Sequence, residues 1–290
     1  MPVYKIKHVT RYRYQQPVTI CHHIAHLLPR ETPRHIWNFA DLEIFPPAMR
    51  TDRLDYFGNR QTFFSIQEPH RELLVTARGA VEILPPAAGM LFSNQPWEQA
   101  RDSLWVNEYA DFTNVIQFTY ESTNVVLSPE AKLYAAESFP TNRPVVEAVV
   151  DLIRRIHHDF QFDATVTTVG TSVAEILRHR RGVCQDFAHL GIACLRSLGL
   201  AARYVSGYLR TVPPPNTPRL VGADASHAWL SVYVPEAGWL DFDPTNNMIP
   251  AERHITIAYG RDFSDVSPLR GVILGGGKHA VHVSVGVAAG

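Results

Sequence analysis

The stretch Gly182-Val183-Cys184-Gln185-Asp186-Phe187-Ala188-His189 begins a segment with helical periodicity. Apolar residues recur three and four positions apart from Cys184 to Leu200, and Gly199 is a typical helix end. Cys184 therefore falls in the first turn of a predicted helix. There the unpaired backbone N–H groups and the partial positive charge of the helix favour the reactive thiolate form of a cysteine. The same N–H groups can hold the oxyanion that develops during acyl transfer.

Two neighbours of Cys184 have predicted supporting roles. Gly182 permits a close approach of backbone or substrate. Asp186 lies in the first helical turn, where an acidic side chain either stabilises the helix dipole or holds a loop near the site. A lone cysteine is more often a small buried apolar residue than a nucleophile, so partners for Cys184 are needed before an enzyme is inferred.

A strand pair downstream supplies those partners. His227 begins a predicted strand that ends at Val234, and the segment from Trp239 to Asp243 forms the next. A two-residue loop mixes polar and apolar residues on both faces of the hairpin, whereas an odd-length loop centred on Pro235 sets His227 opposite Asp243. Cross-strand Cβ atoms lie about 5 Å apart, so one imidazole nitrogen can bind the carboxylate while the other faces a thiol.

In this register one hairpin face is apolar and the other is largely polar. The polar face carries His227, Trp229, Ser231, Tyr233, Trp239, Asp241 and Asp243. A nucleophilic Cys184 activated by His227, which a carboxylate orients, is the cysteine version of the catalytic triad. Asp241 points to the same side and is the rival orienting acid. Cys, His and Asp without a second close pair form a weak zinc signature, so we expect no metal and no cofactor.

Three stretches resemble, in order, motifs of the transglutaminase-like superfamily, in particular its bacterial transglutaminase-like cysteine protease branch. They are the stretch quoted first, then Ser226-His227-Ala228-Trp229, and then Gly238-Trp239 with Phe242-Asp243-Pro244-Thr245-Asn246. The resemblance implies that Cys184, His227 and Asp243 are nucleophile, base and orienting acid, with Trp229 as a supporting residue. It also implies a papain-like helix packed on an antiparallel sheet.

The resemblance extends toward both ends of the chain. His8-Val9-Thr10 and Asp55-Tyr56-Phe57-Gly58-Asn59 are similar to the β domain that precedes the core in this branch. The segments 259–266 and 270–272 resemble its C-terminal motif. Within that motif, Arg261 and Asp262 are expected either to line the substrate cleft or to form a structural ion pair.

The predicted fold class is α+β with an N-terminal antiparallel β domain. Residues alternate with a period of two from Tyr4 onward, and after Pro144 the apolar spacing changes to three and four. We expect four parts: a β-sandwich-like domain at 1–85, a connecting segment at 86–145, a transglutaminase-like catalytic core at 146–250, and a C-terminal extension at 251–290. The extension is expected to pack on the core or on the β domain.

Composition limits the partners and the compartment. The 290 residues include 46% hydrophobic and 19% charged, and the formal charge is −1, so neither nucleic acid nor an anionic membrane is an expected partner. The N-terminus lacks a signal-peptide pattern, and no apolar run approaches the ~20 residues of a membrane span. Three cysteines are odd in number and too few for a disulfide framework, and Cys184 and Cys194 lie ten positions apart on one predicted helix, too far to pair. We expect a cytoplasmic protein.

The expected activity is that of a thiol-dependent hydrolase, a protease or amidase, which forms a thioester with an amide or peptide carbonyl. Transfer of the acyl group to an amine, as in a transglutaminase, is an alternative, and a catalytically silent binding or scaffolding module is another. The expected substrate is a peptide, a protein or a small amide. Specificity is assigned to loops such as Val212–Asp224.

Overall fold

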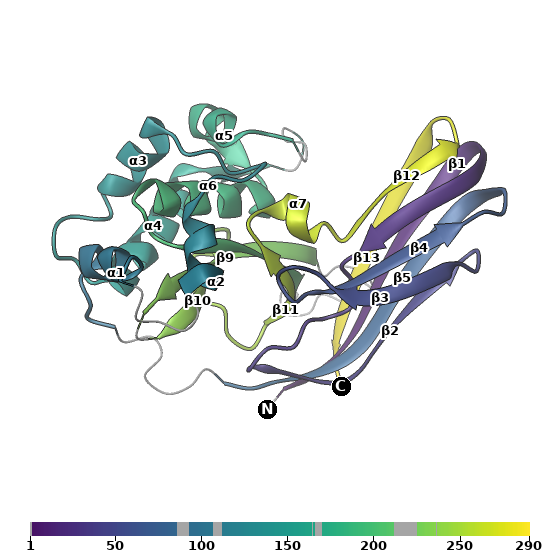
Figure 1. Ribbon diagram of the computed structural model, residues 1–290, viewed down its shortest axis with the longest axis horizontal. Helices are drawn as coiled ribbons and strands as arrows, with labels where there is room; N and C mark the ends of the chain where they lie inside the picture. Colours follow the sequence, from purple (N-terminus) through teal and green to yellow (C-terminus); the bar gives the residue numbers. More distant parts are fainter. Residues whose placement is uncertain are drawn as a thin grey trace, which may run out of the picture.

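The structure, a computed structural model, describes residues 2–85, 93–106, 112–163, 165, 170–211, 225–235 and 237–290. Two lobes lie side by side, a helix-rich lobe and a lobe made of long strands (Figure 1). The loop Val212–Asp224, to which specificity was assigned, lies outside the described residues.

The β lobe is a seven-stranded antiparallel sheet organised around one long strand. β1 (Val3–Ala25) pairs with β5 and β13 through its first half and with β4 and β12 through its second half. The other strands of this sheet are β2 (His35–Phe45), β3 (Met49–Leu54), β4 (Arg60–Ile66), β5 (His70–Ile83), β12 (Leu269–Gly275) and β13 (His279–Ala289). Burial alternates along the first eight residues of β1, as the sequence period of two predicts.

The two ends of the chain meet in the β lobe. The Gly290 backbone N–H donates to the Val3 carbonyl at 2.8 Å, and the two termini lie close together in Figure 1. Residues of the predicted C-terminal extension are shared between the lobes. β11 (His254–Gly260) joins the sheet of the helix-rich lobe, whereas β12 and β13 join β1. The chain thus crosses between the lobes a second time, which ties them together.

The helix-rich lobe contains a four-stranded antiparallel sheet in the order β10-β9-β8-β11. Its first three members in chain order are β8 (Ala202–Leu209), β9 (Ala225–Val234) and β10 (Gly238–Phe242). α6 (Cys184–Ser197) packs across β9 and β8. Gly191 makes this approach close, because a Cβ atom built there would lie 2.4 Å from Leu230 Cδ2. The prediction of a helix packed on an antiparallel sheet is confirmed.

Three other helices, α3 (Pro129–Ala136), α4 and α5 (Val173–His179), pack against α6. α4 (Val145–Asp159) begins directly after Pro144, and Leu152, Ile153 and Ile156 from its apolar face are buried in the core. α5 begins with a capping box in which Ser172 accepts from the Glu175 N–H. The other elements of this lobe are α1 (Trp97–Ser103), α2 (Phe112–Ile116), the 3₁₀ helix η1 (Gln117–Thr119), α3 (Pro129–Ala136), β6 (Gln161–Phe162), α5 (Val173–His179), β7 (Arg181–Gly182) and α7 (Phe263–Val266).

The hairpin β9–β10 differs from its predicted register. Val234 pairs with Gly238 and Leu230 with Phe242, so the pairing is two residues away from the one that sets His227 opposite Asp243. Gly238, the first residue of β10, adopts a φ of +75°, which favours glycine at this turn. Because the shift is an even number of residues, every side chain keeps its predicted face. Asp243 lies just beyond the end of β10 and reaches His227 diagonally.

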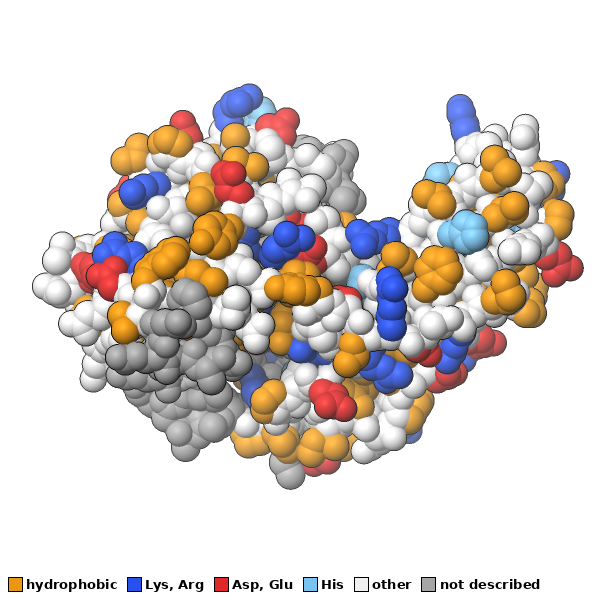
Figure 2. All heavy atoms as spheres, in the orientation of Figure 1, with side chains coloured by type: hydrophobic (Ala, Val, Ile, Leu, Met, Phe, Trp, Pro, Cys, Tyr) orange, Lys and Arg blue, Asp and Glu red, His pale blue; other side chains and the backbone are white. Residues whose placement is uncertain are grey.

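The face of the molecule drawn in Figure 2 shows no dominant charge. In the view of Figure 2, basic, acidic and apolar side chains are interspersed over both lobes, in keeping with the net charge of −1. No helix among the described residues combines the length and apolar composition that crossing a bilayer requires.

Candidate active site

Cys184 is the first residue of α6 and is partly exposed. The chain enters this helix from the short strand β7, where Gly182 pairs with Phe162 of β6. Asp186 Oδ2 accepts from the Val183 backbone N–H at 2.8 Å, so the carboxylate fixes the residue that precedes the nucleophile. A Cβ atom at position 182 would lie 2.8 Å from Asp186 Cβ, which explains the glycine. Gly182 and Asp186 therefore shape the start of the helix.

His227 on β9 connects Cys184 to Asp243. Its Nε2 lies 2.8 Å from Asp243 Oδ2, and both side chains are buried. Cys184 lies near enough to help raise the pKa of His227. Because Nε2 is occupied by the carboxylate, Nδ1 is the nitrogen left for the thiol. The structure thus brings the three residues together in the order Cys184, His227 and Asp243.

Asp243 is held by a set of donors from three segments. Oδ2 is 2.8 Å from His227 Nε2, from His254 Nε2 on β11 and from Asn246 Nδ2. Oδ1 accepts the backbone N–H groups of Thr245, at 3.0 Å, and Asn246, at 3.2 Å. A carboxylate with this many donors is stabilised as the anion and cannot rotate freely.

The electrostatics favour a charged imidazole. Burial alone lowers the pKa of His227, but hydrogen bonds to Asp243 and Cys184 and the charges of these two groups outweigh it and raise that pKa to about 10. Burial raises the pKa of Asp243, yet the bonds from His227 and His254 hold it well below its usual range. At neutral pH the geometry therefore supports an imidazolium between a carboxylate and the sulfur.

Tyr204 on β8 is a further polar neighbour of the thiol. Burial raises its pKa well above the usual value, and the nearby Cys184, Asp186 and Asp262 add to the rise. The hydroxyl therefore stays protonated and can donate near the nucleophile. Its ring centroid lies 5.1 Å from that of His189, a residue of α6.

Asp241 does not contact His227, whereas Trp229 packs against the two histidines of the site. Asp241 pairs in register with Ser231 and lines a large cavity, and it is Asp243 that contacts the histidine. Trp229 is fully buried, with its ring centroid 5.2 Å from that of His254 and 6.0 Å from that of His227. The Trp229 ring therefore packs against both histidines and helps to fix their positions.

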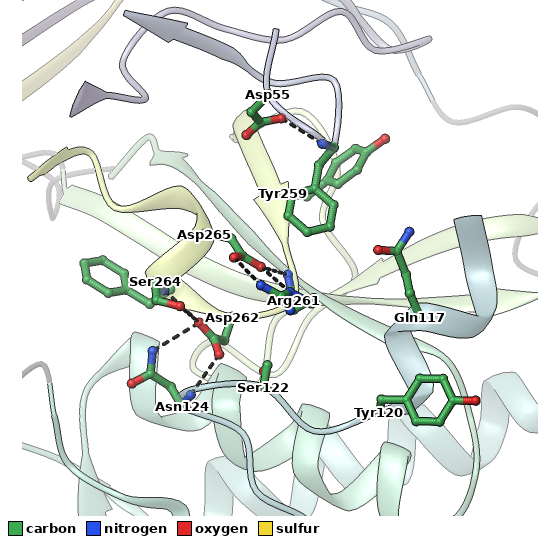
Figure 3. Close-up of polar contacts among 12 residues, drawn as sticks. Asp55, Gln117, Tyr120, Ser122, Asn124, Tyr259, Arg261, Asp262, Ser264 and Asp265 are labelled. Atoms are coloured by element: carbon green, nitrogen blue, oxygen red, sulfur yellow. Dashed lines mark hydrogen bonds and ion pairs between the residues drawn. The ribbon is translucent and has the colours of Figure 1, made fainter. Parts of the chain in front are cut away.

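Arg261 and Asp262 form structural contacts (Figure 3). Both Nε and Nη2 of Arg261 lie 2.9 Å from the Asp265 carboxylate. The fully buried Asp262 accepts from the Asn124 backbone N–H at 2.8 Å and from Ser264, at the start of α7. These bonds hold α7 and the segment before α3 together, and of the two alternatives for Arg261 the contacts favour the ion pair.

Two residues of the site were missed from the sequence. Asn246 is part of a quoted motif, but no role was given to it, and its side chain bonds Asp243 and lies 3.3 Å from His227 Nε2. His254 follows Asp243 by eleven positions on another strand, and no local pattern marks it. His227, Asp243 and His254 also have ligand atoms within 4.8 Å of one another, as in a metal site. Their mutual hydrogen bonds account for this proximity without an ion.

The fold and the site define a class of protein. Residues 134–244 match the model of the transglutaminase-like superfamily, and residues 4–82 match that of the bacterial transglutaminase-like N-terminal region. The chain belongs to the transglutaminase-like superfamily, and family and fold support a thiol-dependent enzyme.

Individual relatives agree with this assignment. An uncharacterized protein of Mycobacterium tuberculosis strain H37Rv is 42% identical over 293 residues, which cover 98% of this chain and 92% of the relative. The protein-glutamine gamma-glutamyltransferase of Pseudomonas aeruginosa is 29% identical over 127 residues, 42% of this chain and 19% of that protein. The crystal structure of a candidate cysteine protease from Cytophaga hutchinsonii shares the fold, with a TM-score of 0.75 at 21% identity over 99% of this chain and 90% of that one.

Proposed function

We propose that the protein is a hydrolase, a protease or amidase, that attacks amide or peptide carbonyls through Cys184. The observation that supports the proposal is the place of Cys184 at the start of α6, next to His227, whose Nε2 lies 2.8 Å from Asp243 Oδ2. The substrate is a peptide, a protein or a small amide. Because a reducing compartment keeps Cys184 a thiol, we place the protein in the cytoplasm.

The proposed hydrolysis has two steps, formation of a thioester and its reaction with water. The thiolate of Cys184 adds to the carbonyl carbon, and His227 gives its proton to the leaving amine as the C–N bond breaks, which leaves a thioester. His227 then takes a proton from water, the hydroxide attacks the thioester carbonyl, and the C–S bond breaks to release the acid and restore the thiolate. Backbone N–H groups at the start of α6 are placed to hold the oxyanion in both steps.

Acyl transfer to an amine is the second candidate. The Pseudomonas aeruginosa relative is named a protein-glutamine gamma-glutamyltransferase, and its match falls on less than half of this chain. In that reaction a primary amine replaces water in the second step, and the residues keep the same roles.

The first test is selective labelling of the thiol. Purified protein is treated with iodoacetamide at neutral pH, and the rate at each cysteine is followed by peptide mass spectrometry. Cys184 is expected to react far faster than Cys21 and Cys194, which are fully buried. Burial also raises the pKa of Cys194 to about 12. Equal rates at all three cysteines would count against a nucleophilic Cys184.

The second test is turnover of acyl substrates. Peptide, glutamine-amide and ester libraries are incubated with the protein, with and without cadaverine, and the products are identified by mass. Cys184→Ala should abolish turnover, whereas Cys194→Ala, on the same helix but in the core, should keep it. Hydrolysis products in the presence of the amine support the hydrolase, and cadaverine adducts support the transferase. Turnover by Cys184→Ala would contradict both the hydrolase and the transferase proposal.

A further inference from the structure

A cavity of about 750 Å³ lies between the two lobes. It is walled by the segment 30–35 and the turn 56–58 of the β lobe, by α2 and η1, and by one face of the sheet β10-β9-β8-β11. Its volume lies in the range of sites for small organic molecules, roughly 300–1,000 Å³. Among the described residues that line it, none is Cys184, His227 or Asp243.

Arg203 is the main cation of this cavity. Its guanidinium carbon lies 3.5 Å from the centroid of the Tyr259 ring and 4.1 Å from that of Trp239. Its Nε is buried and has no hydrogen-bond partner in the described part of the chain. Burial lowers the pKa of Arg203 to about 10, so the side chain is still charged at neutral pH. Stacking holds the planar group in place, and its Nε–H is left without a partner among the described residues.

A second cation shares the same tyrosine ring. The Arg30 guanidinium carbon lies 3.4 Å from the Tyr259 centroid, and its nitrogens donate to the Phe57 carbonyl at 3.0 Å and to Asn59 Oδ1 at 2.6 Å. Arg30 and Arg203 repel each other enough to lower the pKa of Arg203 further. Two guanidinium groups on one ring create a positive potential, and a bound anion would offset their mutual repulsion.

The acids near these arginines form no close ion pairs with them in the described part of the chain. Arg34, also in the lining, donates to three backbone carbonyls, those of Leu84, Pro250 and Ala251. Asp241 lies near enough to raise the pKa of Arg34 and Arg203. Within the described ranges, however, neither it nor Glu31 forms an ion pair with the three arginines within 4.0 Å.

Aromatic rings form a continuous wall beside the arginines. The centroids of Phe57 and Phe118 are 5.8 Å apart, and those of Phe118 and Trp239 are 5.2 Å apart with the rings nearly perpendicular. Tyr233 continues the row at 5.4 Å from Trp239. Such a wall accepts a flat or apolar body, while the guanidinium groups accept a planar anion.

We propose that this cavity is a binding site for a carboxylate carried on an aromatic or apolar body, with the carboxylate at Arg203 and Arg30 and the body against the aromatic wall. The carboxylate belongs either to a free organic acid or to the C-terminal residue of a peptide. This binding site does not include Cys184, and the proposal does not depend on the activity proposed for that residue.

Calorimetric titration of the whole protein tests the ligand class. N-acetylphenylalanine is expected to bind, and its amide, which has the same body without the charge, should bind at least about tenfold more weakly. A hexapeptide with a C-terminal phenylalanine acid distinguishes the sources. If it binds as well as the free acid, the natural ligand is a chain terminus, and if it does not, the ligand is a small acid. Equal binding of acid and amide, or binding of neither, overturns the proposal.

Two variants with opposite expected effects test the residues. Arg203→Met keeps an unbranched side chain between the two rings and should weaken N-acetylphenylalanine binding about tenfold, whereas Arg78→Met, an exposed arginine on β5, should leave it unchanged. Asp241→Asn removes the competing negative charge and should tighten binding roughly fivefold, a result that does not depend on the arginine variant folding. Unchanged affinity in folded Arg203→Met or in Asp241→Asn contradicts the proposal.

Discussion

His254 Nε2 and His227 Nε2 each lie 2.8 Å from the same oxygen of Asp243. His254 comes from β11, at the edge of the sheet where the chain leaves the core for the β lobe. Two histidines, one on β9 and one on β11, therefore bind the same carboxylate oxygen. This arrangement fixes the direction from which Asp243 contacts His227, and it makes the last strand of the core sheet part of the candidate active site.

Replacing His254 with phenylalanine should impair catalysis while leaving Cys184 and His227 in place. A hydrogen bond to a charged group is worth about 1.5–3 kcal/mol, so we expect kcat/KM to fall roughly 10- to 100-fold. The pKa of Asp243 should rise, since one of its donors is lost. The measurement is the pH profile of kcat/KM on the best substrate from the library. His158→Phe, an exposed histidine, is the control, and a His254→Phe profile identical to the parent's would contradict a positioning role.

Asp243→Asn should lower the pKa of His227. The carboxylate favours the charged imidazole, so its loss should move that pKa down from about 10 by roughly 1–3 units. Because the pKa of His227 is raised on folding, its contribution to stability is present below pH 6.5 and is lost as pH rises through about 10. NMR titration of labelled histidines in both proteins measures the shift. An unmoved resonance would show that Asp243 does not set the charge of His227.

His189 should make the fold sensitive to acid. Burial lowers its pKa to about 4, and its Nε2 accepts from the Phe263 backbone N–H at 3.2 Å. The stabilisation is therefore present above pH 6.5 and is lost as pH falls toward about 4, by up to about 3 kcal/mol. Urea unfolding across this range should show a smaller loss for His189→Gln, which keeps an acceptor but does not titrate. His179→Gln, on the exposed end of α5, should lose as much as the parent.

Gly207→Ala should destabilise the sheet that carries His227. Gly207 pairs with His227, and an added Cβ atom would lie 2.2 Å from the Ile255 carbonyl oxygen and 2.6 Å from the Trp229 ring. Overpacking of this kind costs about 1–3 kcal/mol. The free energy of unfolding in urea should fall by that amount, and labelling of Cys184 should slow. Gly170→Ala, where nothing lies within 4 Å of the added atom, is the matched control and should change neither.

Local sequence was sufficient for the helix that begins at Cys184 and for its neighbours. Predicted starts after Pro144 and at Cys184 agree with α4 and α6, and the predicted strand from His227 to Val234 lies within β9. These elements are set by apolar periodicity, by a proline before the first turn and by a glycine after the last, all of which act within a few residues. The fold class follows from the same signals together with the family resemblance.

The long-range pairings were decided only in the tertiary structure. The return of β12 and β13 to β1 joins the two ends of the chain. The β9–β10 register and the place of His254 beside Asp243 join residues closer in sequence, but they too depend on how the strands pack. Sequence alone determined that Cys184 heads a helix and that His227 and Asp243 share one side of a hairpin, because period-two alternation fixes faces. Which donors surround Asp243, and which arginines meet in the cavity, depend on packing between strands and lobes, and no local pattern encodes that packing.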